Sequence, residues 1–311
     1  MYPTRIRLAT GAHNDLLLCE RYFQLEHLLQ GSEGEEHSSI FTFGHAWGEG
    51  IVEYIETGSL DAAVYKAWLS YFPHLEDERR VEEHVFQGLK AAKSTLDRLR
   101  SEWELAEFNG KPARELGFHI DINERFYFQS AIDGVLRHKK DGHLTVLENK
   151  HTFNYIEDIT PMYKNSSQGL AYSVVVDEIA GKPQLNYPLH YLVGQWKMSE
   201  ITRPIIHLFP WKKSLLDRLN WFLTLGMDVQ RLQTMLDMNL FPMRGQNCLQ
   251  YNRPCKYFGF CQSRINDVPK DDAYVEKHKN AHVREVEGSI AFRFKLDDII
   301  ANHLRLIREG V

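Results

Sequence analysis

The spacing of apolar and polar positions divides the chain into a helical first part and a mixed second part. Up to about residue 110, apolar residues recur every three or four positions, for example over 12–30, which predicts helices. From Gly117 the positions alternate and are rich in β-branched and aromatic residues, which predicts strands over 117–138 and 143–153. Helical spacing returns over 166–181 and 213–236. The pattern therefore predicts an α/β fold with a mixed central sheet flanked by helices.

The stretch AIDGVLRHKKDGHLTVLENK predicts a pair of antiparallel strands that carry charged side chains. With Asp141-Gly142 as a two-residue turn, Asp133 lies opposite Lys150 and Val135 lies opposite Glu148. Because side chains alternate along a strand, Asp133, Glu148 and Lys150 then project from one face. The two carboxylates could hold a divalent ion. The alternative is a solvated hairpin whose charged residues have no special role.

Two further elements carry residues suited to the same chemistry. Gln168 and Tyr172 are four residues apart on a predicted helix and share one face. His45 follows Gly44 early in another predicted helix, and histidine is a good ligand for transition metals. Taken singly, each is more often an ordinary structural residue.

In this order the motifs resemble the RecB-type nucleases of the PD-(D/E)XK superfamily. That family has a helical element with glycine and histidine, a strand with DG, a strand ending in ExK and a helix with QxxxY. Here they read Gly44-His45, IDG at Asp133, ENK at 148–150 and QGLAY at 168–172, and the likeness covers residues 14 to 175. His45 follows Gly44 directly, where the family pattern has a spacer.

The resemblance implies a restriction-endonuclease-like core and a role for each motif residue. Asp133 and Glu148 would bind Mg²⁺ or Mn²⁺, with His45 and the backbone carbonyl of Asn149 as further ligands. Lys150 would position or help to deprotonate the attacking water, or stabilise the developing charge. The residues that would steer the substrate strand are Gln168 and Tyr172.

The four cysteines are spaced unevenly. Cys248, Cys255 and Cys261 are close in sequence, whereas Cys19 lies 229 positions before Cys248 in the first predicted helix. Four thiolates hold either Zn²⁺ or an iron–sulfur cluster, and four unrelated buried thiols are the third interpretation. One distant cysteine with three clustered ones resembles the 4Fe–4S cluster of AddB-type and CRISPR-associated nucleases, which implies a structural clip.

Composition restricts how the chain could contact nucleic acid. The formal net charge is −5, which argues against binding by bulk positive charge. Any contact with nucleic acid would then rely on a local patch, or on metal ions that neutralise an acidic site. We expect Arg253 and Lys256, beside the cysteines, to contact phosphates. No GxxxxGK[ST] motif occurs, so any unwinding of DNA would need a separate helicase or recombination protein.

The sequence is interpreted as a single nuclease domain over 1–311. Its parts are a mainly helical region 1–110, a nuclease core 115–235 and an iron–sulfur segment 245–265 that packs back on the N-terminal helix. With no apolar run long enough to span a bilayer, no membrane partner and a cytoplasmic location are expected.

The expected activity is metal-dependent exonucleolytic cleavage of DNA ends or single strands. Its setting would be recombination, repair, or phage or CRISPR-associated DNA processing. The two alternatives are a non-catalytic nucleic-acid-binding subunit with a nuclease fold, and an iron–sulfur redox protein.

Overall fold

The structure is a computed structural model, and it describes residues 2–29, 39–71, 79–197, 200–250, 253–262 and 290–310. The chain divides into two compact units. We call Met1–Glu36, Gly117–Ser130 and Leu219–Val311 the terminal unit, and His37–Leu116 and Ala131–Arg218 the inserted unit. Strands β5 (Arg114–Asp121) and β6 (Phe126–His138) and helix α8 (Leu215–Met238) contribute residues to both units.

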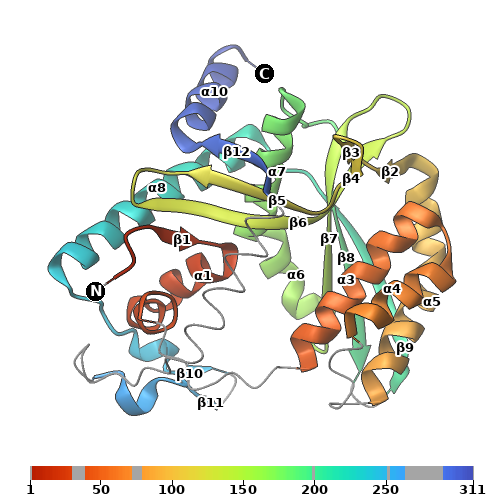
Figure 1. The fold of residues 1–311 in the computed structure, drawn as a ribbon, viewed down its shortest axis with the longest axis horizontal. Coiled ribbons are helices and arrows are strands. Elements are labelled where there is room, and N and C mark those ends of the chain that lie inside the picture. The colour runs from red at the N-terminus through yellow and green to blue at the C-terminus, as the bar shows by residue number, and fades with distance from the viewer. Residues whose placement is uncertain are drawn as a thin grey trace. The chain divides into compact units, whose positions relative to one another are not determined.

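In its described residues, the inserted unit combines helices with a mixed sheet (Figure 1). Its remaining elements are α3 (Ser39–Thr57), α4 (Leu60–Tyr71), α5 (Arg79–Glu102), β2 (Trp103–Leu105), β3 (Glu107–Phe108), β4 (Lys111–Pro112), β7 (Leu144–Thr152), α6 (Ile156–Lys164), α7 (Ser167–Ala180), β8 (Leu189–Lys197) and β9 (Glu200–Trp211). Strand β6 pairs antiparallel with both β2 and β7, β7 pairs parallel with β8, and β8 pairs antiparallel with β9. This is the mixed sheet that the sequence predicted.

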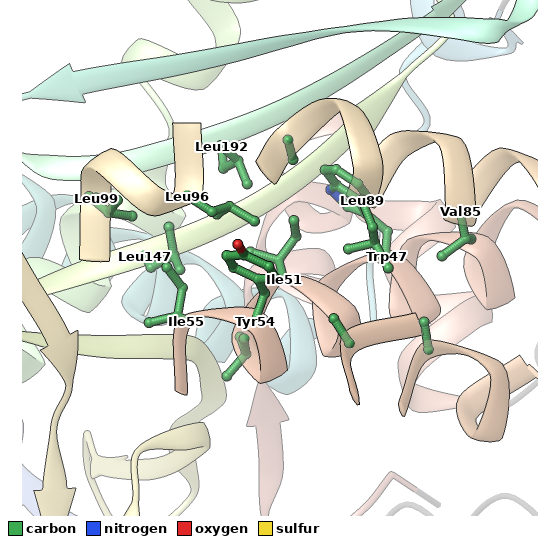
Figure 2. Packing of buried hydrophobic residues seen from close by; sticks show 14 of the residues in the cluster. Trp47, Ile51, Tyr54, Ile55, Val85, Leu89, Leu96, Leu99, Leu147 and Leu192 are labelled. Atoms are coloured by element: carbon green, nitrogen blue, oxygen red, sulfur yellow. The ribbon is translucent and has the colours of Figure 1, made fainter. Parts of the chain in front are cut away.

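The core of the inserted unit lies between two long helices and the sheet (Figure 2). Helix α3 contributes Trp47 and Ile51, and α5 contributes Leu89, which is fully buried. Leu147 of β7 and Leu192 of β8 meet them from the sheet. Each fully buried side chain of this size stabilises the fold by about 1.5–3 kcal/mol, so α3 is held firmly against β7.

The terminal unit contains short helices and strands from both ends of the chain. Its remaining elements are β1 (Ile6–Leu8), α1 (Thr10–Leu18), α2 (Glu20–Phe23), a π-helical turn (Gln24–Leu28), 3-10 turns (Gly245–Asn247 and Phe258–Phe260), β10 (Leu249–Gln250), β11 (Arg253–Pro254), β12 (Ile290–Lys295) and α10 (Leu296–Arg308). Strand β12 pairs parallel with β5, and β1 pairs parallel with β6. Trp221 of α8 packs edge-on against Phe128, with ring centroids 5.5 Å apart.

The single helix predicted over 12–30 is wrong, because the chain breaks at Cys19. That residue is extended, with φ −161° and ψ 115°, and it separates α1 from α2. Cys19 is therefore between helices and not inside one. The next residue, Glu20, has a buried carboxylate that forms ion pairs with two partly exposed arginines far along the chain. The spacing of apolar residues does not reveal such long-range contacts.

The register predicted for the strand pair is also wrong, by two residues. Val135 lies opposite Val146, not opposite Glu148, and the connection between β6 and β7 is longer than a two-residue turn. Asp141 organises this loop, because its carboxylate accepts hydrogen bonds from the ring of His138 at 2.8 Å and from the hydroxyl of Tyr187 at 2.6 Å. Gly142 completes the loop at φ +73°, a conformation that suits glycine.

No helix among the described residues is long and apolar enough to cross a membrane.

Candidate active site

Neighbouring strands of the inserted unit bring the two predicted acids and the lysine together. The backbone N–H of Asn149 donates to Oδ2 of Asp133 at 2.8 Å, which ties the acid on β6 to the middle of β7. The ammonium of Lys150 donates to Oε1 of Glu148 at 2.5 Å. Glu148 is only 1% exposed, so its carboxylate is closed to solvent in this contact.

Burial raises the pKa of both carboxyls. The pKa of Glu148 rises to about 8, because burial and the charge of Asp133 outweigh the ion pair with Lys150. The pKa of Asp133 is raised by burial, although Lys150 and the Asn149 amide oppose the change. The pKa of Lys150 is raised by its two acidic neighbours despite burial. The ionised forms of both acids are therefore disfavoured here, and a bound cation would stabilise them.

Helix α3 presents His45 to the same group. The pKa of Asp133 is lowered by His45 and raised by Glu49, which lies one helical turn after His45. Both side chains are therefore near the Asp133 carboxyl. Gly44 allows the approach, because a Cβ at this position would lie 2.9 Å from the ring of His151 on β7. A larger residue would push the start of α3 away from the strand.

Glu115 is a fourth acid near the site, and the sequence analysis missed it. Its φ of +42° is unusual for a residue with a side chain. Partial desolvation of its carboxyl, with the charges of Asp133 and Glu49, raises its pKa to about 8. No sequence motif marks this position. Glu115 comes near Asp133 because of its backbone conformation, which the local residue pattern does not reveal.

The predicted helix face joins the site through hydrogen bonds. Gln168 Nε2 donates to the hydroxyl of Tyr172 at 2.9 Å, and that hydroxyl donates to the backbone carbonyl of Ala131 at 2.5 Å. Ala131 is two residues before Asp133 on β6. The pair therefore fixes the strand that carries the acid, and Gln168 remains partly exposed.

The donor set matches what a hard divalent ion accepts. Oε2 of Glu148 is buried and has no hydrogen-bond partner among the described residues. Carboxylate oxygens are the ligands preferred by Mg²⁺ and Mn²⁺. Among the same residues, no three His, Cys, Asp or Glu side chains gather closely enough to hold one ion. The other oxygen of Glu148, Oε1, accepts the hydrogen bond from Lys150.

In the terminal unit, all four cysteines line one cavity of about 70 Å³. Each is partly buried. Burial raises the pKa of the Cys261 thiol, with Arg21 opposing and the three other cysteines adding to the increase, so the four sulfurs are electrostatic neighbours.

Polar contacts join the two chain segments beside this cavity. Arg244 forms two hydrogen bonds to the fully buried carboxylate of Glu20, at 2.8 Å and 2.5 Å. The guanidinium of Arg21 donates to the carbonyl of Cys261 at 2.9 Å, and the Asn247 amide donates to the Leu18 carbonyl.

The two predicted phosphate contacts lie near the cysteines. Lys256 pairs with Glu26 at 2.8 Å, and its ammonium is 5.2 Å from the ring centroid of Tyr257. Arg253 lies on β11 opposite Gln250, and its side chain is outside the part of the chain that the structure describes.

Comparison with known proteins agrees with this arrangement. The model of the PD-(D/E)XK nuclease superfamily matches residues 7–262. The chain belongs to the PD-(D/E)XK nuclease superfamily. Its α/β fold with a mixed sheet flanked by helices is the one expected for these nucleases, which commonly use Mg²⁺ or Mn²⁺.

Other comparisons add little to the superfamily assignment. One similar solved structure is a "Putative exonuclease" from Eubacterium rectale, with 12% identity, a TM-score of 0.47 and coverage of 83% of this chain and 94% of that chain. A likeness at this level carries no argument about activity. Among curated proteins, none matches the chain.

Proposed function

We propose that this PD-(D/E)XK nuclease is a RecB-type, metal-dependent DNA exonuclease that hydrolyses phosphodiester bonds at DNA ends or in single strands. The observation that carries the proposal is the convergence of Asp133, Glu148 and Lys150 on adjacent strands. A site built only for stability would not retain a buried acid pair whose ionised forms are disfavoured.

Each residue has a task in this reaction. Asp133, Glu148, His45 and the carbonyl of Asn149 would hold Mg²⁺ or Mn²⁺, which would stabilise phosphate charge and lower the pKa of a bound water. Lys150 would leave Glu148 for the attacking water or the phosphate. Tyr172, with Gln168, positions the β6 strand behind Asp133. The exposed end of Gln168 would also steer the substrate strand.

A cleavage assay tests the proposal. End-labelled single- and double-stranded DNA would be incubated with Mn²⁺, Mg²⁺ or EDTA and with the wild type, Lys150→Ala or Lys140→Ala. Lys140 is an exposed lysine in the loop between β6 and β7, and serves as a matched control. We expect the wild type and Lys140→Ala to shorten DNA from an end with metal, and Lys150→Ala and EDTA to abolish cleavage. Cutting by Lys150→Ala at the wild-type rate contradicts the assignment.

The cysteine-lined cavity supports a 4Fe–4S cluster as a second, structural cofactor. A single Zn²⁺ needs four thiolates about 2.3 Å from one centre, hence within about 4 Å of one another. Either cofactor would be held by four thiolates at once, and all four cysteines line the same cavity. Such a cluster would place this nuclease with the AddB-type and CRISPR-associated enzymes.

Metal analysis of the purified protein distinguishes the two cofactors. We expect iron and acid-labile sulfide in equal amounts, with an iron–sulfur charge-transfer absorbance that Cys255→Ser loses. Met243→Leu, at another wall of the same cavity, should keep it. One equivalent of zinc without sulfide supports the zinc alternative.

Substrate delivery completes the proposal. Arg253 and Lys256 would contact DNA phosphates near the cluster, and a separate helicase or recombination protein would supply unwound ends. The setting would be recombination, repair, or phage or CRISPR-associated processing. A binding subunit without activity, or a redox protein, would be favoured if no metal supports cleavage by folded, cofactor-loaded protein.

A further inference from the structure

An open hollow of about 300 Å³ lies in the inserted unit outside the acid group. We call it the lysine hollow. Its walls come from the junction of α6 with α7, the end of β9 and the start of α8, and its lining residues are Lys164, Asn165, Leu170, Pro210, Trp211, Lys212, Lys213 and Asp217.

The charge of the lysine hollow is positive on balance. Three lysines border it, against the single carboxylate of Asp217. That carboxylate is already engaged, because it accepts hydrogen bonds from the backbone N–H and the hydroxyl of Ser214 at 2.9 Å and 2.8 Å. Lys164 and Lys212 are exposed at the rim, whereas half-buried Lys213 donates to the Lys164 carbonyl. The two rim ammonium groups are thus available to an anion in a chain whose net charge is −5.

An aromatic row on β9 ends in this hollow. The rings of His207 and Phe209 are 5.8 Å apart and 4° from parallel, and those of Phe209 and Trp211 are 5.0 Å apart and 8° from parallel. All three are partly exposed, and Trp211 lines the hollow itself. Flat partly exposed rings beside cations are the surface on which unpaired bases stack while phosphates meet lysine.

One aromatic layer separates the lysine hollow from the acid group. Trp211 packs against Tyr191, with centroids 4.9 Å apart, and Tyr191 stacks with Tyr163 at 6.2 Å. Tyr191 and Tyr163 in turn lie within electrostatic reach of Lys150. The hollow and Lys150 are thus linked through the side chains of Tyr191 and Tyr163.

We propose that the lysine hollow is a subsite for single-stranded DNA, where Lys164 and Lys212 bind a backbone phosphate and Trp211 stacks on an unpaired base. The subsite rests on the proposed nuclease function and adds to it a substrate class, because a paired base would not be free to stack. Binding of the DNA strand at this subsite would also not require the metal ion.

Binding measured without cleavage tests the subsite. Fluorescence anisotropy with a labelled oligothymidylate in EDTA would compare the wild type with Lys164→Gln/Lys212→Gln across a range of salt concentrations. The matched control is Lys140→Gln/Lys182→Gln, which removes two exposed lysines of the same unit outside the hollow.

The expected result is a loss of affinity of about 10-fold, with a slope of log K against log salt reduced by about 0.7, since the two lysines share one phosphate and each phosphate contact on a single strand contributes about 0.7. The control should retain the wild-type slope. Equal losses in the two double variants, or an unchanged slope in Lys164→Gln/Lys212→Gln, overturn the subsite. Tighter binding of an oligouridylate than of the oligothymidylate overturns the choice of DNA.

Base stacking has its own readout. A 2-aminopurine in the oligonucleotide should be quenched on binding to the wild type and to Trp211→Phe, but not to Trp211→Leu. Equal quenching by Trp211→Leu overturns the stacking contact, and Trp211→Phe shows whether a loss comes from misfolding.

The two proposals fail in different ways. One outcome is that the wild type cleaves DNA in a Lys150-dependent way while Lys164→Gln/Lys212→Gln binds DNA as the wild type does. This outcome rejects the subsite and retains the nuclease activity. Loss of binding in that variant, with no cleavage by the wild type under any metal, retains the subsite and rejects the nuclease activity.

Discussion

The backbone amide of Asn149 donates a hydrogen bond to the side chain of Asp133. A main-chain donor of β7 thus fixes the orientation of an acid on β6. The carboxylate is held by the sheet itself, so it needs no contact from a mobile side chain to keep its direction. This preorganisation is what a metal-binding acid requires.

Asp133→Asn should separate activity from stability. The amide can still accept the Asn149 hydrogen bond, but it removes a buried carboxyl whose pKa is raised by desolvation. We expect DNA cleavage to fall at least about 1000-fold, while the free energy of unfolding in EDTA near pH 8 rises by about 1 kcal/mol. Chemical denaturation and the end-label assay measure the two quantities. A variant that is both inactive and less stable would show that Asp133 is a structural residue.

Tyr172→Phe should weaken the support behind Asp133. The change removes the hydrogen bond to the Ala131 carbonyl and also the acceptor of the Gln168 side-chain amide. We expect this to cost about 1–2 kcal/mol of stability. Cleavage should fall about 10-fold, with the loss mainly in kcat. Tyr155→Phe, at a 68% exposed tyrosine, is the control and should change neither. A wild-type kcat in Tyr172→Phe would show that the Tyr172 hydroxyl does not support catalysis.

Gly169→Ala should expose a steric requirement of helix α7. A Cβ there would lie 2.6 Å from the hydroxyl of Tyr191, and we expect a loss of about 1–3 kcal/mol in unfolding free energy. Tyr191→Phe in the same chain should restore most of it, because the clashing oxygen is gone. Gly226→Ala is the control, since a Cβ there meets nothing within 4 Å and alanine favours a helix. Destabilisation that persists in the double variant would refute the clash.

The buried ring of His190 should make folding sensitive to acid. Burial lowers its pKa to about 4, and the ring packs against Trp103 with centroids 5.3 Å apart. In the unfolded chain histidine binds a proton near pH 6.5, so the unfolded state gains protons first and stability is lost as pH falls from about 6.5 toward 4. Between about pH 7.5 and pH 5 this one residue should cost about 2 kcal/mol. Urea unfolding of His190→Leu should lack that part of the pH dependence, and an identical slope in both proteins would contradict it.

Glu20→Gln should loosen the cysteine cavity without removing a thiol. Its buried carboxylate accepts the fork of Arg244 next to Cys19, and charged hydrogen bonds of this kind contribute about 1.5–3 kcal/mol. We expect a lower unfolding free energy and, with the proposed iron–sulfur cluster bound, faster loss of iron to a chelator. Glu309→Gln removes an exposed pair with Arg305 and should leave both unchanged. Iron retention equal to the wild type in Glu20→Gln would separate the ion pairs from cofactor binding.

The sequence analysis placed the acid pair and Lys150 on one face although its hairpin register was wrong. The error was two residues, and side chains alternate with a period of two, so the face was preserved. The turn itself depends on Tyr187, which reaches Asp141 from 46 residues away and cannot be inferred from the local pattern.

Other elements show where periodicity stops being informative. The long amphipathic helices α3 and α5 were predicted, since their apolar faces are their main determinant. The break at Cys19 was not, because ion pairs of Glu20 with arginines more than 200 residues away favour it. Glu115 was missed for a similar reason, since its relevance comes from a backbone conformation and not from spacing.

The positions of the four cysteines along the chain determine when the cavity can form during synthesis on the ribosome. Both segments of the inserted unit end by Arg218, so its chain is finished while the terminal unit still lacks residues 219–311. Cys19 and Cys261 are 242 residues apart, and at about 5–20 residues per second their synthesis is separated by roughly 12–50 s. During that interval the first thiol waits in the nascent chain without its partners. Asp133 and Glu148, the two proposed metal-binding acids, are therefore synthesised before the cysteines that complete the cavity wall.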